Sequence, residues 1–146
     1  MKPVIIQLIT AFIGSMGFAM LFNVNKKYII QGAAGGLIGW AIYLICESAG
    51  MSMFVSSVIT GIFCSAFAEI MARIMKAPAI IFYIPAVVPL IPGSSLYYTV
   101  SNAVAGNAEL FRSFGFATIQ YTFGIAAGIT VVSAVIYMVG KTQNNH

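Results

Sequence analysis

The chain has 146 residues, 60% of them hydrophobic and 7% charged, and its formal net charge is +4. Soluble domains carry about 25% charged residues, so this composition excludes an ordinary soluble domain. A helical span requires roughly 20 apolar residues, which leaves room for about five spans and little else. The sequence therefore predicts an all-α protein, a polytopic transmembrane helical bundle that forms a single transmembrane domain over residues 1–146.

Five spans are expected, over approximately residues 3–22, 28–46, 53–75, 79–105 and 114–139. The second span carries two overlapping GxxxG pairs and the fifth carries one. Small residues at this spacing let helix backbones approach closely. The glycines expected to pack helices are Gly32, Gly36, Gly39, Gly124 and Gly128. The polar tail Lys141–His146 is expected to be disordered.

Glu69 and Arg73 lie four residues apart near the end of the third span. At this spacing the two side chains can pair on one face of a helix. Charged groups inside a membrane usually face a bundle interior or mark an ion path, which would suit a role in gating or proton coupling. Both residues, however, lie within two turns of the end of the span, where long side chains reach the interface. This position favours a structural or topological role, and gating or proton coupling is the alternative.

The fourth span reads as two half-helices. It is apolar enough to cross a bilayer but contains Pro85, Pro89, Pro92 and Gly93 within nine residues. Each proline removes an amide donor and clashes with the carbonyl one turn back, so one unbroken helix is disfavoured. Breaks in lipid are tolerated where protein or a water-filled cavity satisfies the backbone, and in transporters they often form the substrate site. The alternative is a proline-kinked helix with no ligand.

The residues after this break are the most polar at membrane depth. Ser94 or Ser95 is expected to cap a new helix. The N-terminus of a helix carries partial positive charge and unpaired amides, which suit a carboxylate or phosphate. A substrate carboxylate is expected at these amides, with hydrogen bonds from Ser94, Ser95, Tyr97 and Asn102.

The sequence offers little for other chemistries. Cys46 and Cys64 lie inside apolar runs, where cysteines are more often packing residues than a disulfide or metal pair. The single histidine is His146, and the chain has no Asp. Because catalysis requires a nucleophile with a base or a metal cluster, we expect no enzyme, no metal and no cofactor. The scattered basic residues also lack the single basic face of nucleic-acid binders, so no nucleic-acid partner is expected.

Loop charges predict the orientation of the five spans. One side receives Lys26, Lys27, Arg73, Lys76 and Lys141, and the other receives Lys2 and Arg112. The positive-inside rule then places the N-terminus outside and the C-terminus in the cytoplasm. Two homologous units with an odd number of spans have opposite orientations when they are joined in one chain, as in inverted-repeat transporters. This chain shows no internal repeat. A second copy or a partner chain would therefore supply the other unit.

Two segments resemble a known family. They are GFAMLFNV at residues 17–24 and IPAVVPLIPG at residues 84–93, the latter followed by Tyr97. Together with the five-span length, they resemble the threonine/serine exporter family, specifically its short members, which correspond to the C-terminal membrane half of the full-length exporters. The resemblance covers nearly the whole chain. Its matching motif positions at the break are Pro89, Pro92 and Gly93, which join the candidate substrate site.

The resemblance implies a secondary exporter of small hydrophilic metabolites in the cell (plasma or inner) membrane. Substrates of the family are small amino acids such as threonine and serine, or small carboxylates such as succinate. It also implies a larger partner subunit that carries the other membrane half. The lipid bilayer and a homo-oligomer are further expected contacts. The alternatives are a non-transporting scaffold that stabilises a partner membrane protein and, in an oligomer, a pore.

Overall fold

A computed structural model describes residues 4–143, in which every regular element is a helix. Four helices are long and apolar enough to cross a membrane, and a bent pair makes a fifth candidate span. The predicted all-α polytopic bundle with a broken fourth span is therefore confirmed. The elements are α1 (Val4–Leu21), α2 (Lys26–Ser48), α3 (Met53–Met75), α4 (Ile80–Val87), the 3-10 turn η1 (Val88–Leu90), α5 (Gly93–Val104) and α6 (Ala108–Gln143).

The last helix differs from its expected range at both ends. α6 begins at Ala108, whereas the expected span began at residue 114, and it continues to Gln143. The expectation of disorder from Lys141 onward was therefore wrong for residues 141–143, where the helix simply extends past its apolar stretch. Pro3, expected to begin the first span, lies outside the described residues, as do Lys2 and His146.

Local capping explains where the central helices begin and end. The Asn25 side chain accepts a hydrogen bond from the Lys27 amide at 3.1 Å and starts α2. Ser52 does the same for α3 by accepting from the Val55 amide at 3.4 Å. These short polar side chains satisfy amides that have no partner within the helix. α3 ends at Lys76, which adopts a left-handed conformation with φ 50°.

Glycines bring the helices of the bundle into close contact. In α2, a methyl group added at Gly32, Gly35 or Gly36 would meet Pro85 or Ala86 of α4, and one at Gly39 would lie 2.9 Å from Cys64 Sγ of α3. In α6, Gly124 and Gly128 lie against the α3 backbone. Close approach at such positions gives the van der Waals packing that holds membrane helices together.

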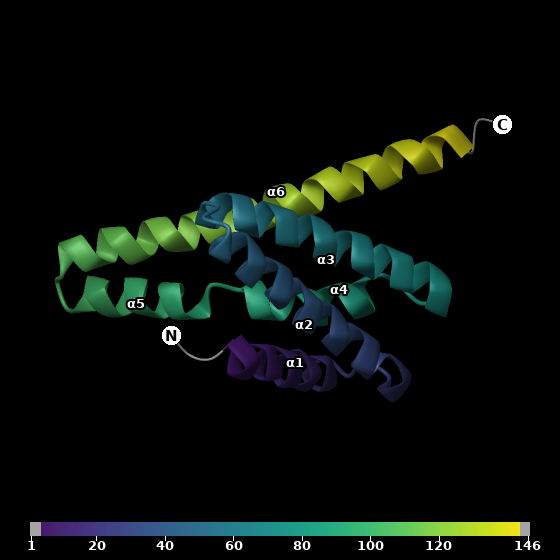
Figure 1. The fold of residues 1–146 in the computed structure, drawn as a ribbon, viewed down its shortest axis with the longest axis horizontal. Coiled ribbons are helices and arrows are strands. Elements are labelled where there is room, and N and C mark those ends of the chain that lie inside the picture. The colour runs from purple at the N-terminus through teal and green to yellow at the C-terminus, as the bar shows by residue number, and fades with distance from the viewer. Residues whose placement is uncertain (1–3, 144–146) are drawn as a thin grey trace.

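α4 is the most enclosed element of the bundle. It packs against α1, α2 and α3, and Phe82, Pro85 and Ala86 are fully buried there. The core cluster of Tyr43, Cys64, Ala86, Leu90 and Ile125 joins α2, α3, the break and α6. By contrast, α5 has no buried residue and packs chiefly against the first half of α6. The broken span therefore begins inside the bundle and ends at its edge (Figure 1).

α6 runs along the long dimension of the molecule, with α5 beside its first half and α3 crossing its middle (Figure 1). Its 36 residues correspond to about 54 Å at a rise of 1.5 Å per residue. The hydrocarbon core of a bilayer is about 30 Å thick. α6 must therefore tilt strongly or extend beyond the hydrocarbon at one end.

Gly128→Ala is expected to destabilise the bundle, because the added methyl group would meet the backbone of Val58 and lie 2.8 Å from the Ile62 amide nitrogen. Overpacking of this kind costs about 1–3 kcal/mol. Gly14→Ala is the matched control, since a methyl group there meets nothing within 4 Å. Thermal unfolding in detergent should show a lower midpoint for Gly128→Ala only. Equal midpoints for the two variants would show that the α3–α6 contact is not tight.

Candidate functional site

The prolines of the fourth span interrupt its backbone ladder. A regular helix would direct the amides of residues 85, 89 and 92 to the carbonyls of Ile81, Pro85 and Val88, and proline has no amide to offer. The Val88 carbonyl instead accepts from the Ile91 amide at 3.2 Å, which forms the turn η1. The Ala86 carbonyl accepts from the Cys64 thiol at 3.4 Å. The two halves of the span meet at an angle of 54°.

The second half-helix starts from a tight turn at Pro92. The Gly93 amide donates to the Ile91 carbonyl at 2.7 Å, and Pro92 has φ −75° and ψ 55°, close to the geometry of an inverse γ-turn. The first hydrogen bond of α5 runs from the Leu96 amide to the Pro92 carbonyl at 2.9 Å. Within residues 4–143, no backbone acceptor is paired with the amides of Ser94 and Ser95.

The expected serine cap was wrong. Pro92 occupies the N-cap position of α5, and no side-chain hydrogen bond caps the helix. The reason is local: the turn at Pro92 starts the helix one residue before Ser94, which places both serines in the first turn. Their amides thus stay open to other acceptors, as the first amides of any helix do.

A cavity of ≈ 140 Å³ adjoins this helix start. Its lining combines backbone and side chains of the break with one aromatic residue from each of α2 and α6. The residues are Trp40, Pro89, Leu90, Ile91, Pro92, Ser94, Ser95 and Tyr121. The break therefore borders a space in which two hydroxyl groups, a phenol and an indole lie close to each other.

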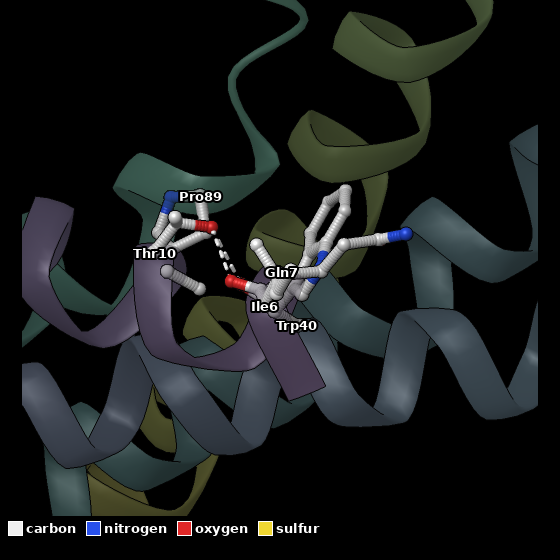
Figure 2. Close-up of a pocket in the computed structure, with 6 residues that line it drawn as sticks. Ile6, Gln7, Thr10, Trp40 and Pro89 are labelled. Atoms are coloured by element: carbon white, nitrogen blue, oxygen red, sulfur yellow. Dashed lines mark hydrogen bonds between the residues drawn. The ribbon is translucent and has the colours of Figure 1, made fainter. Parts of the chain in front are cut away.

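A second cavity of ≈ 430 Å³ lies on the α1 side of the break. Figure 2 shows Ile6, Gln7 and Thr10 of α1, Trp40 of α2 and Pro89 of η1 around it; Ala11 also lines it. The Thr10 hydroxyl donates to the carbonyls of Ile6 and Gln7, at 2.9 and 3.0 Å. Trp40 and Pro89 are the two residues that line both cavities.

An aromatic cluster holds Trp40 in place. Its ring stacks on Tyr43 with centroids 5.2 Å apart and an interplanar angle of 14°. The Tyr43 hydroxyl donates to the Tyr121 hydroxyl at 2.6 Å, which connects α2 to α6. Tyr43 is buried in the core, so the cluster is anchored on its inner side.

The structure brings together only part of the predicted substrate site. Pro89, Pro92, Ser94 and Ser95 line the smaller cavity, and Gly93 lies between them, with open space where a side chain would stand. Tyr97 is 67% exposed and contacts Tyr98 instead. Asn102 donates to the Tyr98 carbonyl at 2.7 Å and lines another cavity, of ≈ 260 Å³, near Gly106 and Asn107.

The Glu69–Arg73 pair lies elsewhere. The two side chains form an ion pair at 3.5 Å, as their spacing predicted. Glu69 lines a cavity of ≈ 180 Å³ between α3, α4 and α6, together with Tyr83 and Ser133, and does not reach the cavities at the break. Arg73 is largely exposed.

Eight residues that line the two cavities were not assigned to a site from sequence, and four of them carry polar groups: Gln7, Thr10, Trp40 and Tyr121. The available signals were weak ones. Gln7 and Thr10 are polar residues three apart in an apolar helix, and Trp40 is the only tryptophan in the chain. None of these features indicates which helix faces the break. No group of three or more potential metal ligands occurs among the residues that the structure describes.

These features define a multi-pass membrane protein whose broken helix adjoins small, partly polar cavities, the arrangement that membrane transporters use for solutes. A family model described as "Threonine/Serine exporter, ThrE" matches residues 7–135, so the chain belongs to that family. The predicted resemblance is thereby confirmed. Membership implies membrane transport of the exporter type and points away from enzymatic activity. No solved structure matches the chain.

Proposed function

We propose that this chain is a membrane subunit of a secondary exporter for small hydrophilic metabolites. The substrates are amino acids of the threonine and serine type or small carboxylates such as succinate. The observation that carries the proposal is the open start of α5 at the smaller cavity. There the amides of Ser94 and Ser95 have no backbone acceptor among residues 4–143, and both residues line a space of ≈ 140 Å³. Family membership supports the transport function.

The substrate carboxylate binds at these amides. Partial positive charge at a helix N-terminus favours an anion, and the unpaired amides supply hydrogen bonds without a charged side chain. The Ser94 and Ser95 hydroxyl groups and the Tyr121 phenol are the polar side chains within reach of the same cavity. Tyr97 and Asn102 act further along α5, on the route between the cavity and the loop at Gly106.

The chain works with a larger partner subunit that carries the other membrane half, in the cell membrane, with its N-terminus outside and its C-terminus in the cytoplasm. The exposed α5 supports a partner, because it presents serine and tyrosine side chains that the rest of this chain leaves uncovered. Polar groups at membrane depth generally face protein or a water-filled cavity. Self-association into a homo-oligomer is the other way to cover them.

The Glu69–Arg73 pair couples or gates transport. Glu69→Gln is expected to lower export while leaving stability nearly unchanged, because Arg73 is largely exposed and i,i+4 ion pairs on helices contribute about 0.3–0.5 kcal/mol. The measurements are efflux rate and the thermal unfolding midpoint. Glu109→Gln, at the start of α6, is the matched control. If Glu69→Gln exports at the native rate, the pair is structural and topological.

The proposal is tested by efflux from loaded cells. Labelled threonine, serine and succinate are followed in cells that express this chain alone, the membrane protein encoded next to it alone, or both. Efflux that requires both chains supports a two-component exporter and identifies its substrate class. Efflux with this chain alone would replace the partner by a homo-oligomer. Background efflux in all three cases, with both proteins present in the membrane, would overturn the transport function for these solutes.

A non-transporting scaffold is the second candidate. It is favoured by the number of glycines that bring helices into contact in so short a chain. A scaffold needs the packing of α2 but not the polar residues of the break, and this difference separates the two candidates experimentally.

A further inference from the structure

We infer that Trp40 determines which solutes the break can accept, by acting as the partition between the two cavities. The inference rests on the proposed function, because it assigns the size limit of the same site. On this inference, the indole keeps a solute bound at α5 in the cavity of ≈ 140 Å³ and out of the neighbouring cavity of ≈ 430 Å³ on the α1 side.

The lining of the cavities carries this inference. Of all their residues, Trp40 and Pro89 alone are shared. Pro89 belongs to the short turn η1, which the backbone of the break fixes, whereas Trp40 is a side chain that reaches the break from α2. Removal of the indole therefore leaves Pro89 as the single shared wall and joins the two spaces from the side of α2.

The position of Trp40 depends on a second helix. Its ring stacks on Tyr43, and the Tyr43 hydroxyl is held by the hydroxyl of Tyr121 at 2.6 Å. Tyr121 belongs to α6 and itself lines the smaller cavity. Tyr121 is thus a positioning residue for Trp40. Its hydrogen bond to Tyr43 holds the Tyr43 ring, and the stacked indole of Trp40 is thereby held between the two cavities.

The lining chemistry indicates the solutes that the partition separates. The smaller cavity offers two serines and a phenol beside the helix start, which suits a short molecule with a carboxylate. The larger cavity adds apolar surface from Ile6 and Ala11 with the amide of Gln7 and the hydroxyl of Thr10. For a longer solute with the same carboxylate to remain in contact with the cavity walls, its chain must extend past Trp40 into this second space.

The test measures binding to the full-length chain, purified in the assembly that supports efflux, either with its partner subunit or by itself. A ligand that binds the folded state raises the unfolding midpoint, by an amount that grows with the logarithm of the ratio of ligand concentration to Kd. Succinate and its longer straight-chain homologue suberate are compared on the native chain, Trp40→Ala, Trp40→Phe and Tyr121→Phe. Phe116→Ala and Tyr137→Phe are the matched controls, since both side chains are exposed on α6 away from the cavities.

The expected result is a change in size preference. Succinate raises the midpoint of the native chain and suberate does not, whereas Trp40→Ala responds to both. Trp40→Phe retains most of the native limit, Tyr121→Phe loses part of it, and the controls behave as native. Because Trp40 is the only tryptophan, its emission in the native chain should change with succinate and not with suberate. If Trp40→Ala fails to fold, the responses of Trp40→Phe and Tyr121→Phe to the two solutes test the inference instead.

The outcomes separate this inference from the proposed function. Equal responses to both solutes in the native chain, or a Trp40→Ala variant that still rejects suberate, would overturn the partition while leaving the binding of short carboxylates intact. A native chain that responds to neither solute, nor to threonine or serine, would overturn the substrate site itself. Efflux of suberate from cells that express Trp40→Ala would extend the result from binding to transport.

Discussion

The double substitution Pro92→Ala with Gly93→Leu is expected to reduce export to background while the chain remains in the membrane. Alanine at position 92 restores the amide that a continuous helix would direct to the Val88 carbonyl. The tight turn before α5 is then no longer favoured over a continuous helix. A Cβ at position 93 would meet nothing within 4 Å. The leucine side chain is introduced to add bulk next to the open amides of Ser94 and Ser95.

Two measurements are needed for this variant: efflux of the substrate identified with the native chain, and the amount of protein in the membrane fraction. Gly14→Leu on α1 is the control, since a Cβ at that position also meets nothing within 4 Å. Native membrane levels combined with absent efflux would support the break as the substrate site. Native efflux from the double variant would remove the break from the mechanism.

Gly36→Leu is expected to have an equally large effect through a different cause, the loss of the folded bundle. Any side chain at this position would collide with the Ser15 hydroxyl and would lie 2.9 Å from the Pro85 carbonyl oxygen, and Ser15 is fully buried. Overpacking a tight core costs about 1–3 kcal/mol for added methylenes, and here backbone atoms must also move. We expect the variant to be degraded or to lose its partner, which co-purification measures.

Together the two variants separate a transporter from a scaffold. Both functions need Gly36, but only transport needs the polar residues of the break. If Ser94→Ala and Ser95→Ala abolish export yet retain the partner, the chain carries out transport. If both substitutions leave every measured property of the complex unchanged while Gly36→Leu dissociates it, the scaffold is the better description.

The fold class could be predicted from sequence because its determinants are local. Long apolar runs define helices in a membrane, and a proline removes its own amide wherever it stands, so Pro85, Pro89 and Pro92 indicated a break before any tertiary contact was known. The pairing of Glu69 with Arg73 was equally local. The predicted serine cap was wrong for a reason that is also local: Pro92 takes the N-cap position that Ser94 or Ser95 was expected to fill.

The composition of the site could not be predicted, because it depends on which helix faces meet. Tyr97 and Asn102 were grouped with Ser94 because they share a half-helix, yet the structure places neither in the smaller cavity. Trp40 and Tyr121 come from distant spans, and in a run of apolar residues an aromatic ring at the break looks no different from one facing lipid. The spacing of the glycines predicted that helices pack closely, but not how each helix is rotated about its own axis.

The prolines of the break have a consequence for motion. When an ordinary helix bends, its backbone hydrogen bonds on the outer side must stretch or open, and this resists the change. At Pro85, Pro89 and Pro92 the donors of three such bonds are already missing from the covalent chain. The angle between α4 and α5 can therefore change with few further hydrogen bonds to break. The break has the features of a hinge, and it lies beside the cavity of ≈ 140 Å³. Because α4 is fixed inside the bundle and α5 lies at its edge, a change in this angle would displace α5 and not α4.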